Sequence, residues 1–99
     1  MYILRFSPSA ARYLKKIKEK NLSAAYKSAL RLLAETPYLG TPKTGDLSGI
    51  YGYDIYYNKT NYELAYRIYE ESGQTVLVIL AGTRENFYDT LKRYIKTAE

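Results

Sequence analysis

Apolar and polar positions alternate along the chain in a way that separates strands from helices. Residues 50–57 and 62–69 alternate with a period of two, which predicts two strands with one core-facing side each. Residues 75–81 are apolar on both faces, so we expect a central, fully buried strand there. A short aromatic and branched segment, residues 2–6, predicts a further strand at the N-terminus.

Two helices are expected between the first two strands. Ser7 and Pro8 are typical of a helix start, with Ser7 as the N-cap and Pro8 at the first helical position. The triplet Asn21-Leu22-Ser23 predicts a break, after which Ser23 caps a second helix that ends at Thr36-Pro37. So short a link favours an antiparallel helical hairpin.

Turn-forming residues bound the remaining elements. Pro and Gly residues predict a loop over residues 37–49, and polar residues predict turns at 58–61 and 70–74. Thr83 is expected to cap a last helix. The apolar stripe of that helix is formed by Phe87, Tyr88, Leu91, Tyr94 and Ile95.

The resulting element order is β-α-α-β-β-β-α, which is an α+β fold. Three consecutive strands joined by short turns form an antiparallel meander, and the first strand joins the same sheet. The N-terminal helical hairpin packs against one face of this sheet, and a C-terminal helix follows. Because no repeat or linker interrupts the pattern, we expect residues 1–99 to form a single domain.

The composition excludes several classes of catalytic site. The 99 residues include no His and no Cys, which rules out a His base, a Ser-His-Asp triad, a thiol nucleophile and a disulfide. We expect no metal and no cofactor. The longest apolar run, residues 76–81, is too short to span a membrane, and the N-terminus lacks the pattern of a signal peptide. These features favour a cytoplasmic protein that does not associate with membranes.

Positive charge is concentrated in the first half of the chain. Residues 1–50 carry nine basic and three acidic side chains, whereas residues 51–99 carry six basic and seven acidic ones. A basic half of this kind indicates a polyanion or an acidic protein as the partner. The alternative is an ordinary solvated helix face that is rich in Lys.

Three segments, in order along the chain, carry a resemblance to a known family. Residues 46–53, with Leu-Ser-Gly followed by aromatic residues, resemble the start of the second strand in the YoeB branch of RelE relatives. Residues 62–68 resemble the third strand of these proteins, and residues 82–88 resemble their glycine-plus-basic segment after the fourth strand. Together with its element order and basic charge, the chain resembles the RelE/ParE superfamily of toxins from type II toxin–antitoxin modules.

This resemblance implies one of two activities. RelE and YoeB relatives are endoribonucleases that cut mRNA on the ribosome without a metal, whereas ParE relatives inhibit DNA gyrase and lack the nuclease residues. A degenerate, non-toxic member is a third possibility. In each case the resemblance implies an acidic antitoxin protein as partner, docked on the helical hairpin or on an exposed sheet edge.

The residues match the family's nuclease site only in part. Arg84 falls on the family's basic residue after the fourth strand, and Tyr88 falls near its C-terminal aromatic residue. At positions where relatives carry basic residues, this chain has Asp54, Tyr56 and Glu63. The resemblance therefore leaves open whether the site has been rebuilt or lost.

In a rebuilt site, Glu63 or Asp54 is the general base and Arg84 stabilises the phosphate, with Tyr88 as the fourth catalytic residue. Lys43, Tyr56 and Arg67 are then expected to bind RNA or its phosphates. Each of these residues except Arg67 has a structural alternative, in which Lys43 is an ordinary loop residue and Tyr56 serves packing alone. Arg84 pairs with a nearby carboxylate, Tyr88 is a core residue of the last helix, and Asp54 and Glu63 face solvent beside basic residues.

Overall fold

A computed structural model of the chain describes residues 1–71 and 73–98, and its main elements follow the predicted β-α-α-β-β-β-α order. The helices are α1 (Pro8–Lys16), α2 (Lys20–Glu35) and α3 (Phe87–Ala98). The strands are β1 (Ile3–Phe6), β2 (Thr41–Pro42), β3 (Tyr51–Tyr57), β4 (Thr60–Tyr69) and β5 (Thr75–Thr83). The expected loop after α2 contains the short strand β2 between two 3₁₀ turns, Pro37–Leu39 and Gly45–Leu47.

The five strands form one mixed sheet with the order β1-β5-β4-β3-β2. The strands from β2 to β5 pair antiparallel, which confirms the meander, and β1 joins the sheet by pairing parallel to β5. The predicted α+β fold is therefore confirmed, with β5 as an interior strand between β1 and β4.

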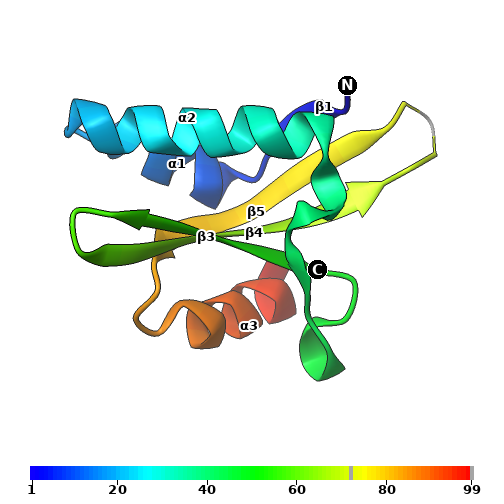
Figure 1. The fold of residues 1–99 in the computed structure, drawn as a ribbon. Coiled ribbons are helices and arrows are strands. Elements are labelled where there is room, and N and C mark those ends of the chain that lie inside the picture. The colour runs from blue at the N-terminus through cyan, green and yellow to red at the C-terminus, as the bar shows by residue number, and fades with distance from the viewer. Residues whose placement is uncertain (72, 99) are drawn as a thin grey trace.

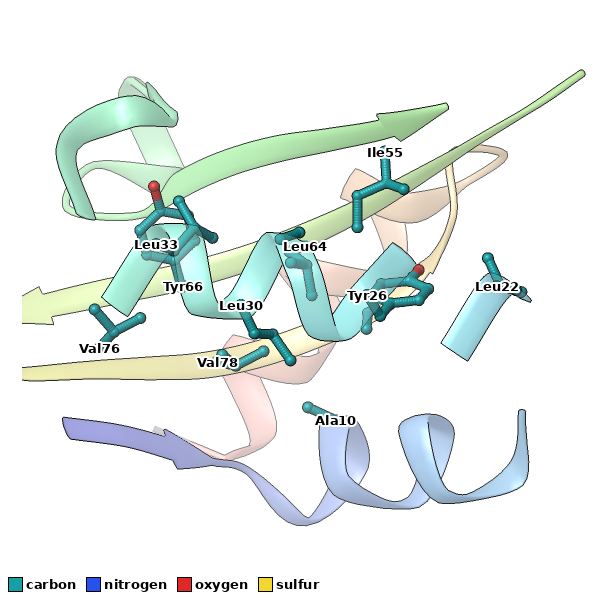
Figure 2. Close-up of a cluster of buried hydrophobic side chains, with 12 residues drawn as sticks. Ala10, Leu22, Tyr26, Leu30, Leu33, Ile55, Leu64, Tyr66, Val76 and Val78 are labelled. Carbon is teal, nitrogen blue, oxygen red and sulfur yellow. The ribbon is translucent and has the colours of Figure 1, made fainter. Parts of the chain in front are cut away.

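Helices cover both faces of this sheet, with α1 and α2 on one side and α3 on the other (Figure 1). The larger cluster of buried side chains lies under α1 and α2 and includes Tyr26, Leu33, Leu64, Tyr66 and Val78 (Figure 2). A second cluster, with Leu47, Ile50, Ala65, Phe87 and Leu91, lies between the sheet and α3. The strands β4 and β5 thus contribute buried residues to both clusters, as expected for β5 alone, whereas β3 is covered mainly on the side of α1 and α2.

The break between α1 and α2 lies earlier than predicted. Helix α1 ends at Lys16 and α2 begins at Lys20, so the predicted break at residues 21–23 is wrong. The N-cap of α2 is Glu19, whose carboxylate accepts a hydrogen bond from the Asn21 backbone N–H at 2.9 Å. Ser23 is an ordinary capping residue by type, but here it lies inside the first turn because the side chain of Leu22 is buried in the core.

The β3–β4 hairpin closes through two residues, and the four-residue turn predicted at 58–61 is wrong in its second half. Asn58 and Lys59 both have positive φ, at 50° and 63°, as two-residue hairpin turns require. Thr60 and Asn61 already pair with β3. This tight turn sets the register, which places Asp54 directly opposite Glu63.

The connection from β5 to α3, in contrast, is longer than predicted. Thr83 does not cap α3, because it is the last residue of β5 and pairs with Tyr62. The chain turns through residues 84–86, with Asn86 at a positive φ of 58°, and α3 begins at Phe87. The predicted apolar stripe of this helix is confirmed, since all five of its residues belong to the cluster under α3. Across residues 1–71 and 73–98, no helix has the length and apolar character needed to cross a bilayer.

Candidate active site

A polar pocket of about 280 Å³ opens on the face of the sheet that α3 covers. Its walls come from the loop before β3, from β3 and β4, and from the turn between β5 and α3. Five of the seven predicted site residues line this pocket: Lys43, Asp54, Glu63, Arg84 and Tyr88. Segments far apart in the sequence therefore converge at one place.

Glu63 lines the bottom of the pocket, with 1% of its surface exposed, and among the residues whose burial the structure describes it is the one charged residue that is buried. The hydroxyl of Tyr88 donates a hydrogen bond to Glu63 Oε2 at 2.5 Å. Arg84 Nε lies 3.7 Å from Glu63 Oε1. Opposite Glu63 on β5 is Gly82, which has no side chain to fill the space above the carboxylate.

Burial raises the pKa of the Glu63 carboxyl, because removal from water disfavours its charged form. The Asp54 carboxyl directly across the strand pair raises the same pKa further. The hydrogen bond from Tyr88 and the positive charge of Lys43 act in the opposite direction. A carboxyl with a raised pKa is suited to accept and return a proton near neutral pH.

Tyr88 lies in the first turn of α3, where its ring packs in the core and its hydroxyl makes a polar contact. Its ring packs with the cluster under α3 and meets the Phe87 ring edge-on, with centroids 5.2 Å apart. Burial and the hydrogen bond to Glu63 raise the pKa of the Tyr88 hydroxyl, so it stays protonated at neutral pH and acts as a donor. Lys43 Nζ lies 4.6 Å from the ring centroid, a cation–π contact.

Gly52 makes this crowded arrangement possible, and sequence reasoning missed it. A Cβ atom at Gly52 would lie 2.6 Å from the Tyr88 hydroxyl oxygen and 2.8 Å from Lys43 Cε. The only sequence signal was a glycine inside a predicted strand, which often marks the close approach of another group. The pocket also includes the loop residues Leu39, Gly40 and Thr41, which no chemical motif had singled out.

Two predicted RNA-binding residues lie outside the pocket. Tyr56 is on the same sheet face as Asp54 but points into solvent, with 69% of its surface exposed. Arg67 lies further along β4, where its guanidinium is beside Gly49. The alternative in which Glu63 faces solvent is contradicted by its burial, whereas Asp54 is exposed at the pocket rim.

The pocket combines a buried carboxylate, a hydroxyl donor and two cations, Lys43 and Arg84. This set can move a proton and stabilise negative charge on a bound phosphate. Within the part of the chain that the structure describes, no three His, Cys, Asp or Glu side chains lie close enough together to hold a metal ion.

In a comparison with protein families, residues 4–92 match a family model. The matching model describes a ParE-like toxin of type II bacterial toxin–antitoxin systems. No curated protein sequence matches the chain.

Solved structures give further likenesses. The chain is similar to one in the crystal structure of the toxin–antitoxin complex RelBE2 from Mycobacterium tuberculosis, with 31% identity, a TM-score of 0.64, and coverage of 84% of this chain and 98% of that one. It shares its fold with a chain of the intact Escherichia coli RelBE toxin–antitoxin complex, at 24% identity and a TM-score of 0.67, covering 83% and 95% of the two chains. It also shares its fold with a double arginine-to-alanine variant of free E. coli RelE, at 23% identity and a TM-score of 0.68, covering 93% and 96%.

Proposed function

Because the chain belongs to the ParE-like toxins of type II bacterial toxin–antitoxin systems, we propose that it arrests translation by cleaving mRNA on the ribosome. The observation that supports this most strongly is the convergence of Glu63, Tyr88, Arg84 and Lys43 in one pocket. A structural ion pair on a sheet needs neither a buried carboxylate at a pocket floor nor a hydroxyl donor directed at it.

The reaction that fits these groups is attack of a ribose 2′-OH on the adjacent phosphate. Glu63 accepts the 2′-OH proton as the oxygen attacks phosphorus, and Arg84 and Lys43 stabilise the charge that grows on the phosphate oxygens. Tyr88 donates its proton to the leaving 5′ oxygen and regains one from Glu63 through their 2.5 Å hydrogen bond. The products are a 2′,3′-cyclic phosphate and a 5′-hydroxyl end, with no net gain or loss of protons.

A second candidate function is inhibition of a protein target such as DNA gyrase, as the resemblance to ParE implies. The observation that favours it is the pair of acidic residues Asp54 and Glu63, which lie directly opposite each other on the neighbouring strands β3 and β4. Two carboxylates repel an RNA phosphate, and relatives that cleave RNA carry basic residues at these positions. A non-toxic member that only binds its antitoxin would have the same feature.

Mapping of mRNA 5′ ends after induction of the toxin distinguishes these functions. The nuclease predicts new 5′ ends inside translated codons, which disappear when translation initiation is blocked and are absent with Glu63→Gln. Growth arrest with intact mRNA would contradict the proposed nuclease activity. Gyrase inhibition would then be tested with a supercoiling assay.

We further propose an acidic antitoxin as the partner, as in the toxin–antitoxin complexes that the chain resembles. A groove of about 520 Å³ runs between α1 and α2, with Leu14, Ile17, Tyr26 and Leu30 among its apolar residues. Lys15 and Lys27 also line this groove. An amphipathic segment with acidic flanks fits such a surface, and both partner and ribosome are consistent with a cytoplasmic toxin.

Charge reversal tests this docking surface. Lys15→Glu combined with Lys27→Glu is expected to weaken antitoxin binding at least about tenfold, since like charges then face each other. Lys92→Glu combined with Lys96→Glu, on the opposite side of the sheet, is the matched control, because it changes the net charge by the same amount. Equal affinity of the groove variant and the control would exclude the α1–α2 groove as the docking site.

A further inference from the structure

The loop that connects α2 to β3 forms one wall of the candidate active site. Residues 39–41 and Lys43 line the pocket from this side, whereas Arg84 and Tyr88 line it from the other. Pro37, Leu47 and Ile50 hold the two ends of the loop by burial, whereas the side chains of Tyr38 and Leu39 between them are exposed. At residues 38–40, hydrogen bonds therefore contribute to holding the loop against the sheet.

Tyr66 supplies two of these hydrogen bonds from inside the core. Its side chain is fully buried in the middle of β4, among the residues under α1 and α2 (Figure 2). The Tyr66 hydroxyl donates to the Pro37 carbonyl oxygen at 2.6 Å and accepts from the Gly40 N–H at 3.0 Å. One hydroxyl thus joins both ends of the turn at residues 37–40 to the centre of the sheet.

The contact between Tyr66 and this turn leaves no room for adjustment. A Cβ atom at Gly40 would lie 2.2 Å from the Tyr66 hydroxyl oxygen and 2.9 Å from the Gly52 carbonyl oxygen. The Tyr66 ring is stacked on the Tyr51 ring, with centroids 5.7 Å apart and planes 22° from parallel. Burial raises the pKa of Tyr66 to about 12, so the hydroxyl keeps the proton that it donates to Pro37.

The position of the Gly40 backbone also affects that of Lys43, which lies three residues further along the chain. Thr41 pairs with Gly52 and Pro42 with Tyr51 in the β2–β3 ladder, and the Lys43 N–H donates to the Ile50 carbonyl at 2.9 Å. A shift at the start of this two-residue strand therefore displaces the Lys43 backbone. The Lys43 ammonium then loses its place beside the Tyr88 ring.

We propose that Tyr66 is a positioning residue of the candidate active site, whose hydroxyl fixes the loop that carries Lys43. Tyr66 does not line the pocket, and its hydroxyl acts through the backbone of Pro37 and Gly40. The proposal rests on the proposed function in one respect, namely that Lys43 is a phosphate-binding residue.

The first test requires no assumption about the reaction. In Tyr66→Phe, hydrogen exchange of the Gly40 amide is expected to accelerate at least about tenfold, because its buried acceptor is gone. The rate of acetylation of Lys43, followed by mass spectrometry, is expected to change relative to Lys92. Tyr51→Phe is the matched control, since it keeps the stacked ring and Tyr51 has no side-chain hydrogen bond to the loop among the described residues.

The control is expected to behave as the wild type in both measurements. Unchanged exchange at Gly40 and unchanged acetylation of Lys43 in Tyr66→Phe would overturn the proposal. If Tyr66→Phe does not fold, Gly40→Ala disturbs the same contact from the side of the loop. The same change in Lys43 acetylation is then expected. Unchanged acetylation of Lys43 in this variant would overturn the proposal.

The second test uses ribosome-dependent RNA cleavage and separates positioning from general stability. Tyr66→Phe is expected to lower kcat/KM about tenfold in the wild-type background and hardly at all in a Lys43→Ala background, because the two changes remove the same contact. An equal loss in both backgrounds would show that Tyr66 acts through the fold as a whole, and would overturn the proposal. If the wild type cleaves no RNA, the proposed function fails, and the exchange and acetylation measurements still decide the role of Tyr66.

Discussion

The Tyr88 hydroxyl donates a 2.5 Å hydrogen bond to the buried carboxylate of Glu63, and this contact connects α3 to the central part of the sheet. The Glu63 side chain is almost fully shielded from bulk solvent, so its charge depends on the groups that surround it in the pocket: Asp54, Tyr88, Arg84 and Lys43. The same contact therefore bears on stability and on the proposed acid–base chemistry.

Removal of the Tyr88 hydroxyl is expected to destabilise the fold. Tyr88→Phe leaves a buried carboxylate without its closest donor, at a cost of about 1–3 kcal/mol at neutral pH. Urea denaturation at pH 7 measures this difference. Tyr69→Phe, at an exposed tyrosine of β4, is expected to stay within about 0.5 kcal/mol of the wild type. Equal stability of the two variants would mean that Glu63 is satisfied without Tyr88.

The raised pKa of Glu63 gives a pH dependence with a definite sign. Because the folded-state pKa lies above its ordinary value of 4.5, the folded protein binds the Glu63 proton more tightly than the unfolded chain does. The stabilisation from this group is complete below pH 4.5 and is lost as the pH rises through the folded pKa. Glu63→Gln removes the titration, so its stability relative to the wild type is expected to increase with pH over that window.

Glu70→Gln is expected to change the pH dependence of stability in the opposite direction. Hydrogen bonds from Tyr38 and Tyr2 hold the pKa of Glu70 below its ordinary value, so the contribution of Glu70 is present above that value and is lost as the pH falls. Thermal unfolding is measured above pH 4.5 for Glu63→Gln and below pH 4.5 for Glu70→Gln, and the slopes should differ from the wild type in opposite directions. Slopes of the same sign would contradict the assignment for Glu63.

Arg84 is expected to be needed for activity and not for folding. Its side chain is largely exposed at the pocket, 3.7 Å from Glu63. Arg84→Ala is expected to lower RNA cleavage about 100-fold or more, since it removes a cation that faces the developing charge on the phosphate. Antitoxin affinity should stay unchanged, and Lys92→Ala, an exposed change on α3, should retain both properties. Wild-type cleavage by Arg84→Ala would remove this residue from the site.

The β3–β4 turn offers a stabilising substitution away from the pocket. Lys59 has a φ of 63°, which strains any residue with a side chain, whereas glycine adopts this conformation freely. Lys59→Gly converts the turn to Asn-Gly, and we expect a gain of about 0.4–1 kcal/mol by urea denaturation. Lys59→Ala removes the same charge and should bring no gain. A gain with Ala equal to that with Gly would identify the charge, and not the backbone, as the cause.

Periodicity along the chain was enough to predict the elements and their order. Alternation in β4 correctly placed Tyr62, Leu64, Tyr66 and Ile68 on one face, because a strand leaves its side chains no other arrangement. Helical spacing correctly gave the buried stripe of α3. Two helix starts were predicted wrongly, since Ser23 and Thr83 have the side chains of capping residues but are held in a helix and a strand by burial and pairing.

Local spacing and side-chain chemistry are properties of short segments, so they were enough to predict the α+β fold, the meander and the residue types available for chemistry. That α3 covers the face opposite α1 and α2, and that Lys43, Gly52, Glu63 and Tyr88 meet there, followed from tertiary packing. That convergence depends on the strand register and on the exit angle of α3, which are set by packing between distant segments. The burial of Glu63 follows from the same packing, so no inspection of its neighbours in sequence would have distinguished it from a solvent-facing residue.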